Sequence, residues 1–134
     1  MTLNTEERNA IVTIRLQKAK ETLQEVKVIV TMNLWRTAAN RLYYACYYAV
    51  SALLIKHGYS PRTHSGTISL LSLHFVSKGL VNEQQGKFYG NLFELREKGD
   101  YSDWVVIEAE DVLSRLQPAE KFIAEIEKLI VSIP

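Results

Sequence analysis

The sequence predicts an all-α protein, an up-and-down bundle of about five helices. Apolar residues recur at helical spacing along most of the 134 residues, and 47% of the chain is hydrophobic, enough to bury a core without disulfides. The chain has only six glycines and three prolines, which disfavours an all-β fold with many tight turns. Because no repeat or linker divides residues 1–134, we expect a single helical domain.

The first two helices are predicted over residues 5–30 and 34–57. The apolar residues of the first recur between charged residues at helical spacing; they are Ile11, Leu16, Ala19, Leu23, Val26 and Val30. Asn33 offers an N-cap for the second helix, because asparagine accepts hydrogen bonds from the free amides of a first turn. Gly58 is well placed to end it.

A loop over residues 59–67 leads into the third helix. Ser60, with a proline after it, and Thr63 are the two candidate N-caps. The helix carries Ile68, Leu71 and Phe75 on its apolar face, and Gly79 is placed to stop it.

The last two helices are predicted over residues 82–98 and 107–131. Asn82, with Gln85 three residues later, has the pattern of a capping box and opens the fourth helix. Gly99 stands where that helix would end. Pro118 lies inside the fifth apolar pattern, so that helix either kinks or divides in two, and we favour one kinked helix.

Charge and cysteine content limit the kinds of function. The formal net charge is +1, so a strongly basic nucleic-acid binder is not indicated, although residues 1–60 carry a balance of +4 and residues 61–134 a balance of −3. The single cysteine, Cys46, excludes an intramolecular disulfide and a multi-cysteine metal site. We expect no metal and no cofactor.

No part of the sequence indicates a membrane or an export signal. The first ten residues, MTLNTEERNA, are polar and acidic, unlike a signal peptide. The longest stretch without Asp, Glu, Lys, Arg or His runs over the fourteen residues from Leu42 to Ile55, which is too short to span a bilayer. We therefore expect a cytoplasmic protein that does not contact the membrane.

Four of the seven tyrosines lie in residues 40–48, NRLYYACYY. A helical projection separates this segment into two faces at about 100° per residue. One face holds Ala38, Leu42, Ala45, Cys46, Ala49 and Leu53 and is the predicted core face. The other holds Asn40, Arg41, Tyr44, Tyr47, Tyr48 and Ser51. Tyrosine rings with hydroxyls suit a subunit contact or a ligand cleft. For the tyrosines alone we favour the other interpretation, a central helix whose tyrosines reach outward to water.

Two further polar positions, Arg41 and His64, are candidates for a site. Arg41 is always charged, and its planar guanidinium suits a carboxylate such as Asp100 or a ligand phosphate. His64 follows the candidate cap Thr63 near a helix N-terminus, which disfavours a charged imidazole; it could bind as a neutral ring or simply join two helices.

The segment LREKGDYSD, residues 95–103, supplies the last candidates. If the helix continued to Asp100, Arg96 and Asp100 would form an i,i+4 ion pair. If Gly99 breaks the helix, which we favour, Asp100 and Tyr101 lie at its end and can turn into a cleft.

Three segments in this order, NRLYYACYYAVSALL, THSG and LREKGDYSD, resemble the HEPN domain, named for higher eukaryotes and prokaryotes nucleotide-binding. The resemblance runs from the second helix to the end and is closest to the small, free-standing prokaryotic members. It implies a helical bundle and a homodimer. In many members, two subunits face each other across a cleft and cut RNA without a metal, through an arginine followed four to six residues later by a histidine.

Carried over to this chain, the motif arginine is Arg96, and Glu97 can take the polar position after it. The histidine should stand at position 101, 102 or 103, where the chain has Tyr101, Ser102 and Asp103. The family's catalytic histidine is therefore missing. Since histidine exchanges protons near neutral pH and tyrosine does not, cleavage would need His64 or His57 to substitute, or Asp100 to accept a proton.

The resemblance also implies a partner. Small members are often encoded beside a minimal nucleotidyltransferase, as in a toxin–antitoxin pair, and the transferase can modify a tyrosine in the arginine–histidine motif. Tyr101 is the nearest candidate here.

Three functions follow as hypotheses. The first is a dimeric module that binds nucleotide or RNA phosphates through Arg41, Tyr44, His64, Arg96, Asp100 and Tyr101. The second is a metal-independent toxin ribonuclease with an atypical active site, whose catalytic candidates are Arg96, Asp100, Tyr101 and His64. The third is a non-catalytic interaction subunit, in which these residues form a structural network.

Overall fold

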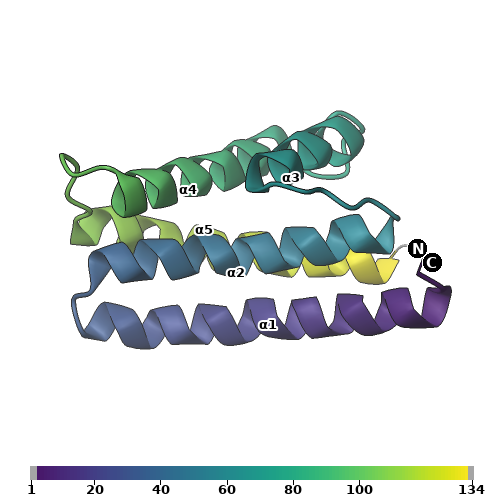
Figure 1. Ribbon diagram of the computed structural model, residues 1–134, viewed down its shortest axis with the longest axis horizontal. Helices are drawn as coiled ribbons and strands as arrows, with labels where there is room; N and C mark the ends of the chain where they lie inside the picture. The colour runs from purple at the N-terminus through teal and green to yellow at the C-terminus, as the bar shows by residue number, and fades with distance from the viewer. Residues whose placement is uncertain (1–2, 133–134) are drawn as a thin grey trace.

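Four long helices and a short helical insertion form the computed structural model, which describes residues 3–132 (Figure 1). The long helices are α1 (Thr5–Thr31), α2 (Trp35–Lys56), α4 (Glu83–Tyr101) and α5 (Ala109–Ser132). The insertion is α3 (His64–Leu71), which continues into a π-helical segment, η1 (Ser72–Val76). Residues 3–132 contain no β-strand, so the all-α bundle of about five helices is confirmed.

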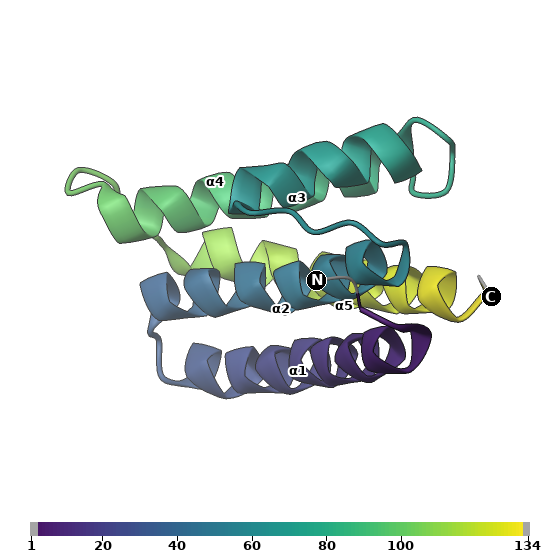
Figure 2. The same cartoon turned by 45° about the vertical axis from the view of Figure 1, so that its right-hand side comes forward.

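The long helices alternate in direction, as the colours in Figure 1 show. Helix α2 lies in the middle of the bundle and packs against α1, α3, α4 and α5. After α2 the chain runs back along the bundle before α3 begins, so α3 and η1 lie beside α4 (Figure 2). This placement brings the first turn of α3 and the last turns of α4 onto the same side of α2.

The predicted core face of α2 is confirmed. Its six residues Ala38, Leu42, Ala45, Cys46, Ala49 and Leu53 are all fully buried. Small side chains let neighbouring helices come close, which explains how one helix can be surrounded by four others. Burial raises the pKa of the Cys46 thiol, so Cys46 is an inert core residue.

Two of the predicted helix N-caps, Asn82 and Thr63, are confirmed, and a third, Asn33, is wrong. Asn82 accepts a hydrogen bond from the Gln85 amide at 2.7 Å and opens α4 as predicted. Thr63, one of the two candidates, is the N-cap of α3 and accepts from the Gly66 amide at 2.9 Å. Asn33 is not an N-cap, because its backbone has a left-handed φ of 58° in the turn before α2. Leu34 takes the cap position without a side-chain bond.

Two glycines take left-handed conformations just beyond helical segments, as the sequence predicts for Gly58 (φ 85°) and Gly79 (φ 75°). Gly99 does not end a helix. Helix α4 continues through it to Tyr101, three residues past the predicted end. Gly99 is closely packed instead, because an added Cβ would lie 3.1 Å from Ile107 Cγ1 and 3.4 Å from Arg36 Cγ. The last helix, α5, is one continuous helix with Pro118 inside it.

Among the described residues no helix is both long and apolar enough to cross a membrane.

Candidate functional site

The candidate site is built from three elements that meet over the tyrosine face of α2. This face supplies Asn40, Arg41 and Tyr44, the first residue of α3 is His64, and the last turns of α4 supply Arg96, Asp100 and Tyr101. The connection after α2 carries the chain back along the bundle (Figure 1), so His64 at the start of α3 lies within 3.4 Å of the hydroxyls of Tyr43 and Tyr44. We call this group the arginine–tyrosine cluster.

Arg96 is the centre of the cluster and is only 6% exposed. Its guanidinium carbon lies 5.4–5.9 Å from the centroids of four aromatic rings, those of Tyr43, Tyr44, Phe93 and Tyr101. Burial by itself would lower the pKa of Arg96, but the surrounding tyrosines and carboxylates raise it above its usual value. The side chain is therefore a buried positive charge.

The hydrogen bonds of Arg96 are long and incomplete. Nε donates to Asp100 Oδ2 at 3.4 Å and Nη2 donates to the Tyr101 hydroxyl at 3.3 Å, both beyond the usual range for such bonds. Nη1 is buried without a hydrogen-bond partner, and the Glu97 carboxylate is 4.0 Å away. A buried cation with a free donor is costly to keep, and such groups gather at functional sites.

Asp100 is held by two elements. Its Oδ2 accepts from Arg96 within α4 and, at 2.8 Å, from Asn40 Nδ2 on α2. Since α4 runs through Gly99, Arg96 and Asp100 are an i,i+4 pair on one helix, and the expectation that Asp100 lies beyond a helix break is wrong.

Arg41 does not bind Asp100. Its guanidinium carbon lies 5.3 Å from the centroid of the Tyr44 ring, and no described Asp or Glu oxygen is within 4.0 Å of it. Arg96 lies 5.4 Å from that same ring. Two guanidinium groups therefore converge on Tyr44, and only one of them has a carboxylate partner.

His64 belongs to the cluster. Its Nδ1 is 2.9 Å from the Tyr43 hydroxyl, its Nε2 is 3.4 Å from the Tyr44 hydroxyl, and its ring centroid is 4.7 Å from that of Tyr47. Burial lowers the pKa of His64 and the charge of Arg96 lowers it further, while Glu97 opposes them. The ring is therefore neutral near pH 7, able to donate from one nitrogen and accept at the other.

His57, the other histidine considered as a substitute, lies elsewhere. It follows the end of α2 and its ring packs edge-on against Phe75 at 5.0 Å. Its Nε2 is buried without a partner, and burial lowers its pKa, with Lys56 and Lys78 acting in the same direction. Of the two histidines, His64 is the one in contact with the cluster.

Three buried polar side chains, those of Tyr43, Thr67 and Tyr89, pack around the inner side of His64. Tyr43 and Tyr89 are fully buried with stacked rings, 5.8 Å apart. Thr67 Oγ1 donates to the His64 carbonyl at 2.6 Å and lies 2.7 Å from the Tyr89 hydroxyl. Burial raises the pKa of Tyr43 to about 12, so its hydroxyl keeps its proton and can donate to His64. These three side chains fix the orientation of the histidine.

Sequence reasoning missed Tyr43, Phe93 and the role of Asn40. Tyr43 lies between the two faces in the helical projection, so its burial depends on how α2 is rotated against α4. The pairing of Asn40 with Asp100 spans 60 positions and has no local signal. Phe93, three residues before Arg96, is the one that spacing on α4 could have indicated, because such residues are neighbours on a helix.

Tyr101 ends α4 and is 70% exposed, and Trp104, in the loop that follows, is 94% exposed. Ser102 is half-buried and Asp103 is exposed. The three positions where the histidine was expected therefore lie at the rim of the cluster.

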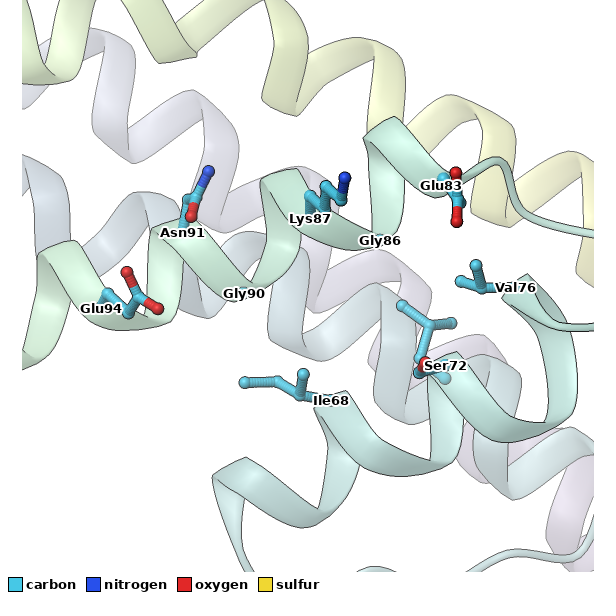
Figure 3. Close-up of a pocket in the computed structure, with 10 residues that line it drawn as sticks. Ile68, Ser72, Val76, Glu83, Gly86, Lys87, Gly90, Asn91 and Glu94 are labelled. Atoms are coloured by element: carbon cyan, nitrogen blue, oxygen red, sulfur yellow. The ribbon is translucent and has the colours of Figure 1, made fainter.

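A separate hollow of about 360 Å³ opens between α3–η1 and α4. In Figure 3, Ile68, Ser72 and Val76 approach from one side, and Gly86 and Gly90 face them from α4. At Gly90 the hollow is open, because an added Cβ there would meet nothing within 4 Å, whereas at Gly86 the Val76 side chain packs close to the helix. None of the predicted site residues lines it. Among the described residues, no group of three or more His, Cys, Asp or Glu side chains could hold a metal ion.

Comparison with known proteins shows which family this chain resembles. The model of the HEPN domain family matches residues 12–129. A Thermotoga maritima protein named "UPF0332 protein" is 40% identical over 124 residues, covering 92% of this chain and 94% of its own. A Methanocaldococcus jannaschii protein named a "putative toxin" is 32% identical, covering 88% and 87%. An Archaeoglobus fulgidus "UPF0332 protein" is 28% identical, covering 87% and 93%.

Proposed function

The chain belongs to the HEPN domain family, and on that basis we propose that its arginine–tyrosine cluster binds the phosphates of a nucleotide or an RNA strand. The convergence of Arg41 and Arg96 on the Tyr44 ring carries this proposal. Both guanidinium carbons lie within 5.4 Å of the centroid of this ring, so an anion bound beside the ring would be attracted by both charges. A guanidinium binds a phosphate through paired hydrogen bonds, and the exposed Tyr101 offers a ring for a base.

The relative named a "putative toxin" supports a toxin-like role for this chain. We further propose that the chain is one component of a toxin–antitoxin-type pair with a minimal nucleotidyltransferase, as the family resemblance implies. The exposed Tyr101 and Trp104 beside the cluster suit a protein contact, which a homodimer or such a partner would provide.

A second candidate function is metal-independent RNA cleavage. His64 favours it, because a neutral imidazole can take a proton from a ribose 2′-hydroxyl, and Arg96 lies close enough to lower its pKa. In this reading His64 replaces the histidine missing after Arg96. The binding hypothesis does not require it.

One experiment tests both functions. We expect a short oligoribonucleotide to bind the wild-type protein, and Arg41→Gln and Arg96→Gln each to weaken binding by about 10- to 100-fold, the usual effect of losing charged hydrogen bonds. Lys121→Gln on α5 is the matched control, since it removes the same charge from an exposed site. Binding is measured by fluorescence anisotropy at fixed ionic strength, because phosphate binding depends on salt.

The same mixtures, kept in EDTA and run on a denaturing gel, report cleavage. Cleavage that disappears in His64→Ala and remains in His57→Ala would support the ribonuclease. Binding without cleavage would leave only the binding function. The proposed function would be wrong if the wild-type protein bound no oligoribonucleotide. It would also be wrong if the Arg41 and Arg96 variants bound the oligoribonucleotide as tightly as the wild-type protein does.

A further inference from the structure

The aromatic face of α2 continues beyond the arginine–tyrosine cluster, and there it meets two cations from α1. Lys18 Nζ lies 5.0 Å from the centroid of the Tyr48 ring. Arg15 Nη1 donates to Ser51 Oγ at 2.6 Å. Neither α1 residue belongs to the proposed site.

These contacts are continuous with the cluster. The Tyr48 ring centroid is 6.1 Å from that of Tyr44, which carries Arg41 and Arg96. Along α2 the order is Arg41, Tyr44, Tyr48 and Ser51, at spacings of three and four residues that keep them on one side of the helix. Ten residues of helix separate Arg41 from Ser51, a length of about 15 Å.

The cations of this surface lack carboxylate partners. No described Asp or Glu oxygen lies within 4.0 Å of Arg15 or Lys18. Lys20 and Lys27, also on α1, are different, because they pair with Glu127 and Glu120 of α5 at 2.5 and 3.3 Å. The lysines on the α5 side of α1 are therefore neutralised, while the cations on the tyrosine side are not.

The nearest carboxylate in sequence to Lys18 is that of Glu21, and Gln17 Nε2 donates to it at 3.0 Å. Lys18 is exposed, and Arg15 is half-buried. The surface formed by α1 and α2 therefore presents positive charges next to aromatic rings. It extends past the arginine–tyrosine cluster, from Arg41 to the contact of Arg15 with Ser51.

We propose that this surface, the cationic strip made of Arg15, Lys18, Arg41, Tyr44 and Tyr48, binds a continuous single strand of RNA. Lys18 and Arg15 contact phosphates beyond the one held at the cluster, and the tyrosine rings pack against bases or sugars. Proteins bind single strands in this way, because every nucleotide carries a phosphate and a base with an aromatic face. The ligand is then an oligonucleotide of several units rather than a mononucleotide, a conclusion that rests on the proposed function.

Oligonucleotide length separates the strip from the cluster. We expect Lys18→Gln to weaken the binding of an oligouridylate octamer by about fivefold. It should also lower the salt dependence of that binding by about 0.7 in the slope of log K against log salt. A uridylate dinucleotide, which fits the cluster alone, should bind Lys18→Gln as it binds wild type. Lys18→Arg should bind like wild type. Lys20→Gln is the control, since it removes the same charge from the same helix.

The outcomes distinguish this inference from the proposed function. If neither length binds the wild-type protein, the proposed function fails and the strip fails with it. If Arg41→Gln weakens both lengths and Lys18→Gln weakens neither, the cluster binds phosphate but the strip does not exist as a site. If Lys18→Gln changes the oligomeric state in sedimentation and leaves octamer affinity unaltered, the strip is a protein contact and the inference is wrong.

Discussion

His64 depends on one neighbour within its own helix and on two that lie far from it in the sequence. Tyr43 binds its Nδ1 from α2, Thr67 holds its backbone carbonyl within α3, and Arg96 of α4 contributes a positive charge. A histidine at a helix N-terminus is predicted to be neutral from sequence alone. The nearby positive charge of Arg96 is a consequence of the tertiary structure, and it lowers the pKa of His64 further.

We expect an NMR titration to give His64 a pKa below 6.5, its ordinary value, because burial and the charge of Arg96 both disfavour the imidazolium. Arg96→Gln should raise this pKa by removing the charge, and Lys121→Gln should leave it unchanged. The unfolded chain takes up a proton at higher pH than the folded one, so this residue makes the fold less stable as pH falls below about 6.5. A His64 pKa above 6.5, or one that does not change in Arg96→Gln, would contradict the burial of His64 and its closeness to the Arg96 charge.

At the scale of elements, glycines decide how closely helices approach. Sequence patterns place Gly58 and Gly79 correctly, because a left-handed residue beyond a helix has a local cause. The same patterns wrongly predict that Gly99 ends a helix. Helix α4 continues through Gly99, and what this glycine contacts is the Ile107 side chain beyond the helix, which no local pattern shows. The failure at Asn33 is similar: asparagine suits both an N-cap and a left-handed turn, and only the turn geometry chooses between them.

The two glycines beside the hollow on α4 give a matched pair. A Cβ at Gly90 would meet nothing within 4 Å, so Gly90→Ala should stabilise the protein by about 0.5–1 kcal/mol through helix propensity. A Cβ at Gly86 would lie 2.9 Å from Val76 Cγ2, so Gly86→Ala should lose that gain and be neutral or destabilising. Urea unfolding of both variants measures the difference. Equal stabilisation by both would show that α3–η1 and α4 are not packed as described.

At the scale of the molecule, one end of the bundle carries an apolar surface that the chain leaves uncovered. The connection between α4 and α5 projects there (Figure 2), with Trp104 94%, Val106 76% and Tyr101 70% exposed. An aromatic group so exposed next to a charged cluster is typical of a protein contact. The HEPN resemblance led us to expect a homodimer, and this surface is where we propose that the second copy binds.

We expect sedimentation equilibrium to show a dimer for the wild-type protein and a shift toward monomer for Trp104→Ser, because the substitution removes the largest exposed ring. Leu73→Ser is the control, since Leu73 is 62% exposed on η1, outside this surface. A wild-type protein that stays monomeric at high concentration would refute the dimer. If Trp104→Ser dimerised with unchanged affinity, the dimer interface would not lie on this surface.

The sequence by itself determined the class of fold, the core face of α2 and the residue types of the site, because helical periodicity and capping are local properties. It could not determine that Asp100 pairs with Asn40 and Arg96 rather than Arg41, or that His64 and not His57 reaches the cluster. Only the tertiary structure decided these contacts. Apart from the Arg96–Asp100 pair within α4, they join residues 20 to 60 positions apart on different helices, and small rotations of each helix select which side chains meet.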